Sequence, residues 1–256
     1  MFDPDRLPNA DAGRPSRDGG LLQFYSLAGE ALPWLALGAL ALALIGLTVG
    51  LRVSTTALHQ GDSDRILFLH LPATAMTIVL YLLMTVWAVI GIVLNSRAAS
   101  MMASALAPTG ALMAFVALWT GSLWGKPTWG TWWVWDARLS ALLVLLGFFL
   151  LFIAVQELVE DVQQADRAAA RVSMFGLAAL AGVFLWLRAN DALQPTAAAA
   201  RTGAALLPNG MLTGMAIMAL ALLLYCMASA LSRLRSIILE RERDADWVDG
   251  VLRSSA

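Results

Sequence analysis

Long apolar runs are the feature that most restricts the fold of this chain. Six of them can be recognised, at about residues 33–51, 66–94, 101–123, 139–159, 172–188 and 211–233. A hydrocarbon core about 30 Å thick needs roughly 20 helical residues. Charged residues make up only 14% of the chain, whereas a soluble domain carries roughly 25%. We therefore expect an all-α polytopic membrane protein with six transmembrane helices.

Basic residues predict the orientation of these helices. If both termini share one side, that side holds 11 of the 17 lysines and arginines, which favours a cytoplasmic location for both termini. We then expect a cytoplasmic tail at 1–32, a membrane domain at 33–233 and a cytoplasmic tail at 234–256. The polar, acidic N-terminus lacks the pattern of a cleavable signal peptide. Three glycine pairs have a spacing that permits close helix approach: Gly46/Gly50, Gly121/Gly125 and Gly210/Gly214.

Tryptophan is concentrated in one stretch, W-T-G-S-L-W-G-K-P-T-W-G-T-W-W-V-W-D-A-R at 119–138, which is expected as an outer loop between the third and fourth helices. Six of the ten tryptophans lie there: Trp119, Trp124, Trp129, Trp132, Trp133 and Trp135. Tryptophan is flat, mostly apolar and carries one N–H donor. The density suggests a platform for a flat apolar ligand with charged edges, such as heme. The alternative is an extended interfacial aromatic belt.

Charged residues flank the tryptophans. Lys126 and Arg138 are suited to offset the propionates of a heme, or they extend to the interface at helix ends as long basic side chains do. Asp136 precedes the fourth helix, so it is expected to cap that helix or to orient Arg138. The net charge of −1 argues against a nucleic-acid partner.

The chain has two histidines, and histidine is a common axial ligand of heme iron. His70, in R-I-L-F-L-H-L-P-A-T, lies near the outer end of the second helix. It is either an iron ligand facing the loop or a structural histidine bonded to a carbonyl. His59 lies in a polar outer segment and is either a solvated residue or a second ligand. The single cysteine, Cys226, excludes an intrachain disulfide and a C-x-x-C-H heme site.

The run W-G-K-P-T-W-G-T-W-W-V-W-D-A-R-L-S resembles the WWD signature of the heme-handling proteins of cytochrome c maturation. The six-helix plan and the run Q-G-D-S-D-R-I-L-F-L-H-L-P-A are similar to the CcmC branch of that superfamily, over about residues 30–240. The resemblance gives His70 the role of an outer ligand of the heme iron. It also implies that the WWD stretch, with Trp124, Trp129, Trp132, Trp133 and Trp135, contacts heme b.

Further expectations follow from the same resemblance. CcmC proteins lie in the bacterial inner membrane and present heme at its outer face to the heme chaperone CcmE. They work with the ATPase CcmA, the membrane subunit CcmB and the small protein CcmD, surrounded by membrane lipid. No enzyme activity is expected of this chain, which has no G-x-x-x-x-G-K-[ST] motif for a nucleotide phosphate.

The sequence departs from the family pattern at the third outer segment. CcmC proteins carry a second axial histidine there, but R-A-N-D-A-L-Q-P-T-A at 188–197 contains none. Three options remain: five-coordinate heme on His70, a substitute second ligand such as His59 or a methionine, or weakened heme handling. Met211 and Met215 lie near the third outer segment, but methionine there is better explained as a core-filling side chain. The third option gives the alternative function, a degenerate relative that acts as an assembly or docking subunit without stable heme binding.

Overall fold

A computed structural model describes residues 17–52, 65–189, 209–243 and 248 of the chain. The described residues form six helices and no strand. In chain order the helices are α1 (Arg17–Arg52), α2 (Leu67–Val93), α3 (Arg97–Trp129), α4 (Ala137–Leu158), α5 (Val162–Ala189) and α7 (Asn209–Arg241). The all-α expectation therefore holds for the described part of the chain.

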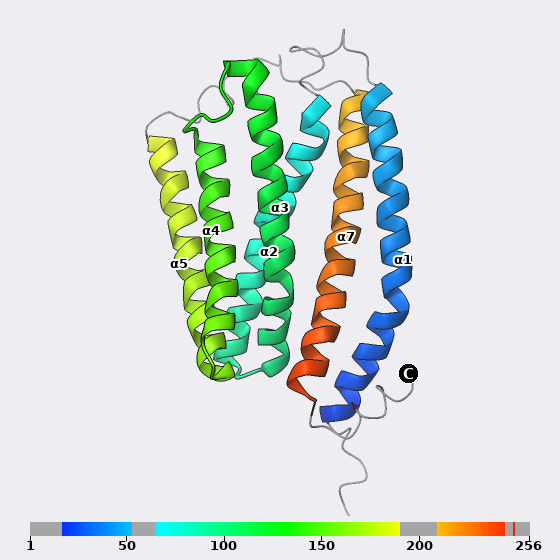
Figure 1. Cartoon of the computed structure of the whole chain (residues 1–256), viewed down its shortest axis with the longest axis vertical. Helices are drawn as coiled ribbons and strands as arrows, with labels where there is room; N and C mark the ends of the chain where they lie inside the picture. The colour runs from blue at the N-terminus through cyan, green and yellow to red at the C-terminus, as the bar shows by residue number, and fades with distance from the viewer. Residues whose placement is uncertain (1–16, 53–64, 190–208, 244–247, 249–256) are drawn as a thin grey trace, which may run out of the picture.

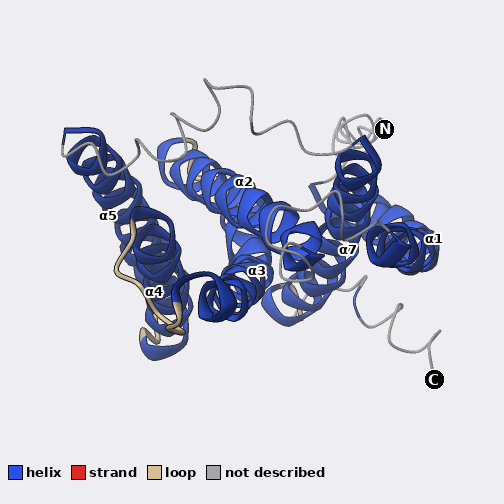
Figure 2. Cartoon of the chain, turned by 90° about the horizontal axis from the view of Figure 1, so that it is seen from above, coloured by secondary structure: helices blue, strands red, loops and turns tan. Residues whose placement is uncertain are grey.

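The helices run side by side as an up-and-down bundle (Figure 1). Seen from above, α4 and α5 lie on one side, α1 and α7 on the other, and α2 and α3 between them (Figure 2). The beginning of α2 and the connection from α3 to α4 lie at the same end of the bundle, whereas the beginning of α1 and the end of α7 lie at the opposite end. The first described helix therefore begins, and the last long described helix ends, at the same end of the bundle.

Five of the helices are long and apolar enough to cross a membrane: α1, α2, α3, α4 and α7. In the most apolar part of the α3 span, 72% is buried inside the bundle, compared with 11% in the corresponding part of α1. Helix α3 is thus the central element, while α1 exposes most of its apolar surface and contacts α7. Helix α5 covers the predicted fifth run but is not among the five, so the sixth crossing remains a prediction.

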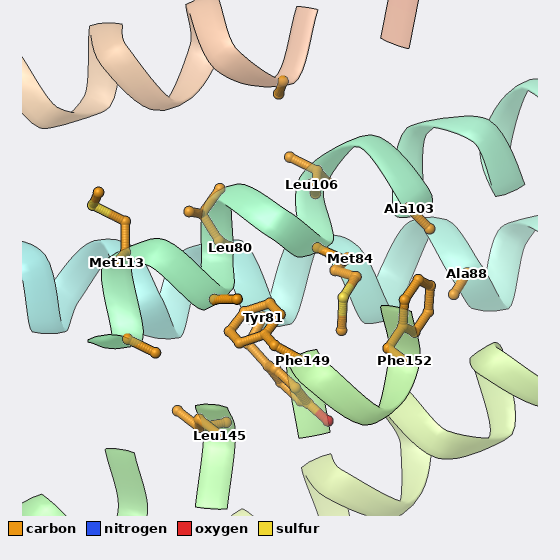
Figure 3. Packing of buried hydrophobic residues seen from close by; sticks show 14 of the residues in the cluster. Leu80, Tyr81, Met84, Ala88, Ala103, Leu106, Met113, Leu145, Phe149 and Phe152 are labelled. Carbon is orange, nitrogen blue, oxygen red and sulfur yellow. The ribbon is translucent and has the colours of Figure 1, made fainter. Parts of the chain in front are cut away.

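The main core lies between α2, α3, α4, α5 and α7 (Figure 3). The Tyr81 and Phe149 rings meet edge to face with centroids 5.1 Å apart, and the buried Tyr81 hydroxyl donates to the Ser173 carbonyl at 3.0 Å. A Cβ on Gly110 would collide with the Phe149 ring, and one on Gly176 with the Tyr81 hydroxyl. These glycines therefore let the two aromatic side chains fill the core.

Two of the predicted glycine pairs lie where helices approach closely. A Cβ on Gly46 of α1 would lie 3.3 Å from the backbone nitrogen of Met218 on α7. Gly50 and Gly214 both face the Phe68 ring of α2, and a Cβ on Gly214 would collide with it. Small residues thus allow the beginning of α2 to insert beside the α1–α7 pair, as close packing in membranes requires.

The helices differ from the predicted apolar runs mainly in length. The predictions 66–94 and 139–159 agree with α2 and α4 within two residues. In contrast, α1 begins at Arg17, α3 continues to Trp129, and α7 ends at Arg241. Hydropathy detects the part of a helix that lies in hydrocarbon, whereas backbone hydrogen bonding continues beyond that layer.

Candidate functional site

The tryptophan-rich stretch is only partly a loop. Helix α3 continues through Trp129 and ends at Gly130, whose φ of 76° is left-handed and whose N–H donates to the Lys126 carbonyl at 3.0 Å. Glycine adopts this conformation without a steric penalty. The Lys126 ammonium donates to the Gly130 carbonyl at 3.0 Å. The predicted loop at 119–138 is therefore corrected to the short connection 130–136.

Asp136 begins the next helix and also holds a basic residue. One of its carboxylate oxygens accepts from the Leu139 N–H at 2.8 Å, which caps α4. The other accepts from the Arg138 guanidinium at 3.1 Å. Both predicted structural roles of Asp136, the cap and the orientation of Arg138, are confirmed.

Arg138 lies over a pair of tryptophans from the end of α3. The Trp124 and Trp129 rings meet edge to face with centroids 5.0 Å apart. The guanidinium carbon lies 5.5 Å from the Trp124 centroid and 5.8 Å from the Trp129 centroid, within cation–π range. Arg138 is thus oriented by the Asp136 carboxylate and by two aromatic rings.

A second aromatic pair lies in the connection itself. The Trp133 and Trp135 rings meet edge to face at 5.4 Å, and the Lys126 ammonium lies 5.7 Å from the Trp132 centroid. Trp132 and Trp135 are 55% and 78% exposed. The indole N–H of Trp133 is buried and has no hydrogen-bond partner among the described residues. Exposed rings and an unpaired donor thus lie together at one end of the bundle.

His70 lies on the first turn of α2 with its side chain buried against α3. Its Nδ1 lies 2.9 Å from the Ala117 carbonyl oxygen and 3.2 Å from the Thr120 hydroxyl. A carbonyl only accepts, so Nδ1 carries the proton and donates. In the neutral ring this leaves the lone pair on Nε2. Both hydrogen bonds that the described residues make with the ring use Nδ1.

The imidazole and the tryptophans share the same packing region. A Cβ on Gly121 of α3 would lie 3.0 Å from Cε1 of His70 and 2.7 Å from a methyl carbon of Leu139. Leu139 belongs to a small buried cluster with Ala73, Ala117, Leu118 and Leu142, and Trp133 packs against that cluster. The structure therefore brings His70 together with the WWD connection.

Some predicted site residues lie elsewhere. Trp119 is 60% exposed and stacks on Phe115 along the side of α3, with centroids 6.1 Å apart. Met211 is fully buried in the bundle. His59 lies outside the described residues. The interpretation of His70 as a structural histidine requires a hydrogen bond to a carbonyl, and that bond is present. It uses Nδ1 only and leaves Nε2 for another partner.

Three residues of the site were missed by the sequence prediction. Ala117 and Thr120 contribute the acceptors that hold the imidazole, and Gly121 gives the ring its space. Only Gly121 had a signal in the sequence, because it belongs to one of the glycine pairs. A backbone carbonyl that accepts a bond across the bundle leaves no pattern in the sequence.

Comparison with known proteins adds an independent observation. The family model for CcmC, described as heme exporter protein C, matches residues 20–249. The chain belongs to the CcmC family. The match covers α2, α3, α4, α5 and α7 and most of α1, so the histidine, the tryptophan-rich stretch and the capping aspartate all lie in the part shared with other CcmC proteins.

Individual CcmC proteins are similar to the chain over different lengths. The heme exporter protein C of Bradyrhizobium diazoefficiens is 34% identical over 234 residues, which are 90% of this chain and 85% of that protein. The proteins of the same name from Escherichia coli K12 and Paracoccus denitrificans are 41% identical over 155 residues and 40% over 144. These matches cover 60% and 56% of this chain, and 63% and 59% of the two relatives.

Proposed function

We propose that this chain binds heme at the outer face of a bacterial inner membrane and presents it to the heme chaperone CcmE. The family membership supports a role in heme export and cytochrome c maturation. The observation that carries the proposal is the fixed imidazole of His70. Its Nδ1 is engaged by α3, which leaves Nε2 for iron beside the WWD connection.

Hydrogen bonding at Nδ1 is the usual way in which proteins prepare a histidine for a metal. The bond fixes the tautomer and the ring orientation, and it raises the basicity of the other nitrogen. The Ala117 carbonyl and the Thr120 hydroxyl supply this support in the present chain. His70 would then be the protein ligand of the heme iron.

The surrounding residues suit the remaining parts of a heme. Exposed rings of Trp129, Trp132 and Trp135 offer apolar area to the porphyrin face. Lys126 and Arg138 bring positive charge to the same end of the bundle, where carboxylates such as the propionates gain from charge-assisted bonds. The buried, unpaired Trp133 N–H is a further donor for such a carboxylate.

Orientation and partners complete the proposal. The excess of basic residues on the side of the termini supports a cytoplasmic location for that end, so the WWD end faces outward. We infer a complex with CcmA, CcmB and CcmD in which this chain holds heme b and CcmA hydrolyses ATP. The chain itself would act as a binding and handover subunit and not as an enzyme.

One observation favours the second candidate function. The segment 188–197 contains no histidine where the family carries its second axial ligand. A subunit that docks its partners without stable heme binding would tolerate this loss. The two functions differ in a direct measurement, the heme content of the purified chain.

The test compares the absorbance spectra of the full chain and of two single variants, produced with CcmA, CcmB and CcmD. His70→Ala should remove most of the bound heme, because the fixed protein ligand of the iron is lost. His59→Ala should have a smaller effect on occupancy. Equal membrane insertion of all three proteins is verified by their yield in the detergent extract.

The outcomes separate the candidates. An unchanged heme spectrum in His70→Ala would overturn the ligand assignment. A parent chain that carries no heme, yet co-purifies with its partners, would favour the docking subunit. A spectral shift confined to His59→Ala would indicate that the first outer segment supplies an axial ligand.

A further inference from the structure

A polar cavity of about 770 Å³ lies at the end of the bundle opposite the WWD connection. It is lined by residues from the turn between α2 and α3, from the first turns of α5, and by Glu242 just after α7. The turn, the start of α5 and the end of α7 lie at the same end of the bundle (Figure 1). Its charged and polar lining residues are Asn95, Ser96, Arg97, Ser100, Gln163, Asp166, Arg167 and Glu242. The proposed heme function uses none of these residues.

Charge pairing inside the cavity is incomplete. Asp166 is neutralised by Arg241, whose guanidinium donates to both carboxylate oxygens at 2.9 and 3.0 Å. Within the described ranges, Arg97, Arg167 and Glu242 form no ion pair. The cavity thus offers two cationic groups and one anionic group to a ligand.

The cationic part of the cavity coincides with the N-terminus of α3. Ser96 caps this helix, accepting from the Ala99 N–H at 3.4 Å, and Arg97 is the first helical residue. The N-terminus of a helix has a partial positive charge and free N–H groups, and it is well suited to a phosphate. Arg97 and Arg167 add the charge-assisted donors that phosphate oxygens prefer.

The level of the cavity relative to the membrane favours a lipid over a soluble anion as its ligand. The candidate spans of α2 and α7 end at Val93 and Arg241, and that of α3 begins at Arg97, so we expect the cavity at the level of the lipid headgroups. Val93 and Leu94, beside it, are 72% and 70% exposed. Acyl chains would cover these apolar side chains, whereas a soluble phosphate would leave them uncovered.

We propose that this cavity binds the headgroup of an amine-bearing phospholipid of the phosphatidylethanolamine type. The phosphate lies against Arg97, Arg167 and the start of α3, and the ammonium group pairs with Glu242. Zwitterionic charge in the ligand matches the mixed charge of the walls, which a purely anionic headgroup does not. Such a lipid would join α2, α3, α5 and α7 at their ends.

The test counts lipids bound to the delipidated full chain by native mass spectrometry, with phosphatidylethanolamine or phosphatidylglycerol added. The double variant Arg97→Gln/Arg167→Gln should retain about tenfold less phosphatidylethanolamine, since it loses two charge-assisted contacts. The matched control Arg171→Gln lies one turn further along α5, outside the cavity, and should behave as the parent chain.

A second pair of variants tests the amine. Glu242→Gln should abolish the preference for phosphatidylethanolamine over phosphatidylglycerol, and Glu240→Gln, outside the cavity, should preserve it. Equal lipid retention in Arg97→Gln/Arg167→Gln and Arg171→Gln would overturn the proposal. So would full displacement of the lipid by millimolar inorganic phosphate, which would identify an ion site. A large gain in lipid binding after truncation beyond Arg243 would identify the chain's own tail as the occupant.

Discussion

Asp136 performs two tasks whose contributions can be separated by substitution. Its carboxylate caps α4 through the Leu139 N–H and pairs with Arg138. Asparagine caps a helix about as well as aspartate but carries no charge, whereas alanine does neither. Asp136→Ala therefore removes both interactions, and Asp136→Asn removes only the charge pair.

The structure sets the size of each effect. Loss of an N-cap costs about 1 kcal/mol. The Arg138 side chain is 43% exposed, so solvent screens the pair and its contribution is about 0.3 kcal/mol. We expect Asp136→Ala to lower the free energy of unfolding by about 1.3 kcal/mol, close to a tenfold change in the unfolding equilibrium constant. Asp136→Asn should lower it by only about 0.3 kcal/mol.

The assay is reversible unfolding in mixed detergent micelles, followed by helical circular dichroism. Asp161 is a matched control, because its carboxylate accepts from the Gln164 N–H at 2.7 Å at the start of α5. Asp161→Ala should cost about as much as loss of the Asp136 cap, about 1 kcal/mol, with heme content unchanged. Equal stability of Asp136→Ala and Asp136→Asn would refute the capping argument.

Three further predictions concern other parts of the molecule. One removes the aromatic rings nearest the proposed heme: Trp129, Trp132, Trp133 and Trp135. Their joint replacement by alanine should weaken heme binding about 30-fold or more, whereas Trp34→Ala on α1 should not; full heme retention in the quadruple variant would count against the platform. CcmA, CcmB and CcmD should co-purify with the chain without added chaperone, and repeated failure in mild detergent would contradict the proposed complex. Gly110→Ala should lower the free energy of unfolding by about 1–3 kcal/mol through overpacking against Phe149, while Gly147→Ala, which meets open space, should not.

The sequence predicted helix bounds best where a polar, turn-forming or capping residue lies next to an apolar run. Asn95 and Ser96 follow the run at 66–94, and Asp136 precedes the run at 139–159. These two runs agree with α2 and α4. Helix α3 was predicted too short, because Gly125, Pro127 and dense tryptophan resemble a loop in composition. Proline near a helix end leaves most of the backbone hydrogen bonding in place, and α3 continues to Trp129.

In the candidate site, contacts between residues close in sequence were predicted, whereas contacts between helices were not. Asp136 and Arg138 are two residues apart, and local capping and pairing rules predicted both contacts of the Asp136 carboxylate. The support of His70 could not be predicted, because the Ala117 carbonyl lies 47 residues away along the chain. A bond of that kind is determined by how α2 and α3 pack, and the amino acid at position 117 contributes only its backbone.

The brevity of the connection between α3 and α4 has a consequence for exchange kinetics. It runs only from Gly130 to Asp136, and both ends are tied, at Gly130 by the Lys126 carbonyl and at Asp136 by its cap on α4. Such a segment has little conformational entropy left to lose when a ligand arrives, which favours affinity. The connection is also too short and too constrained at both ends to close over a ligand as a flap. Release of a bound ligand would therefore depend on competition from an incoming acceptor, so the handover rate should rise with acceptor concentration.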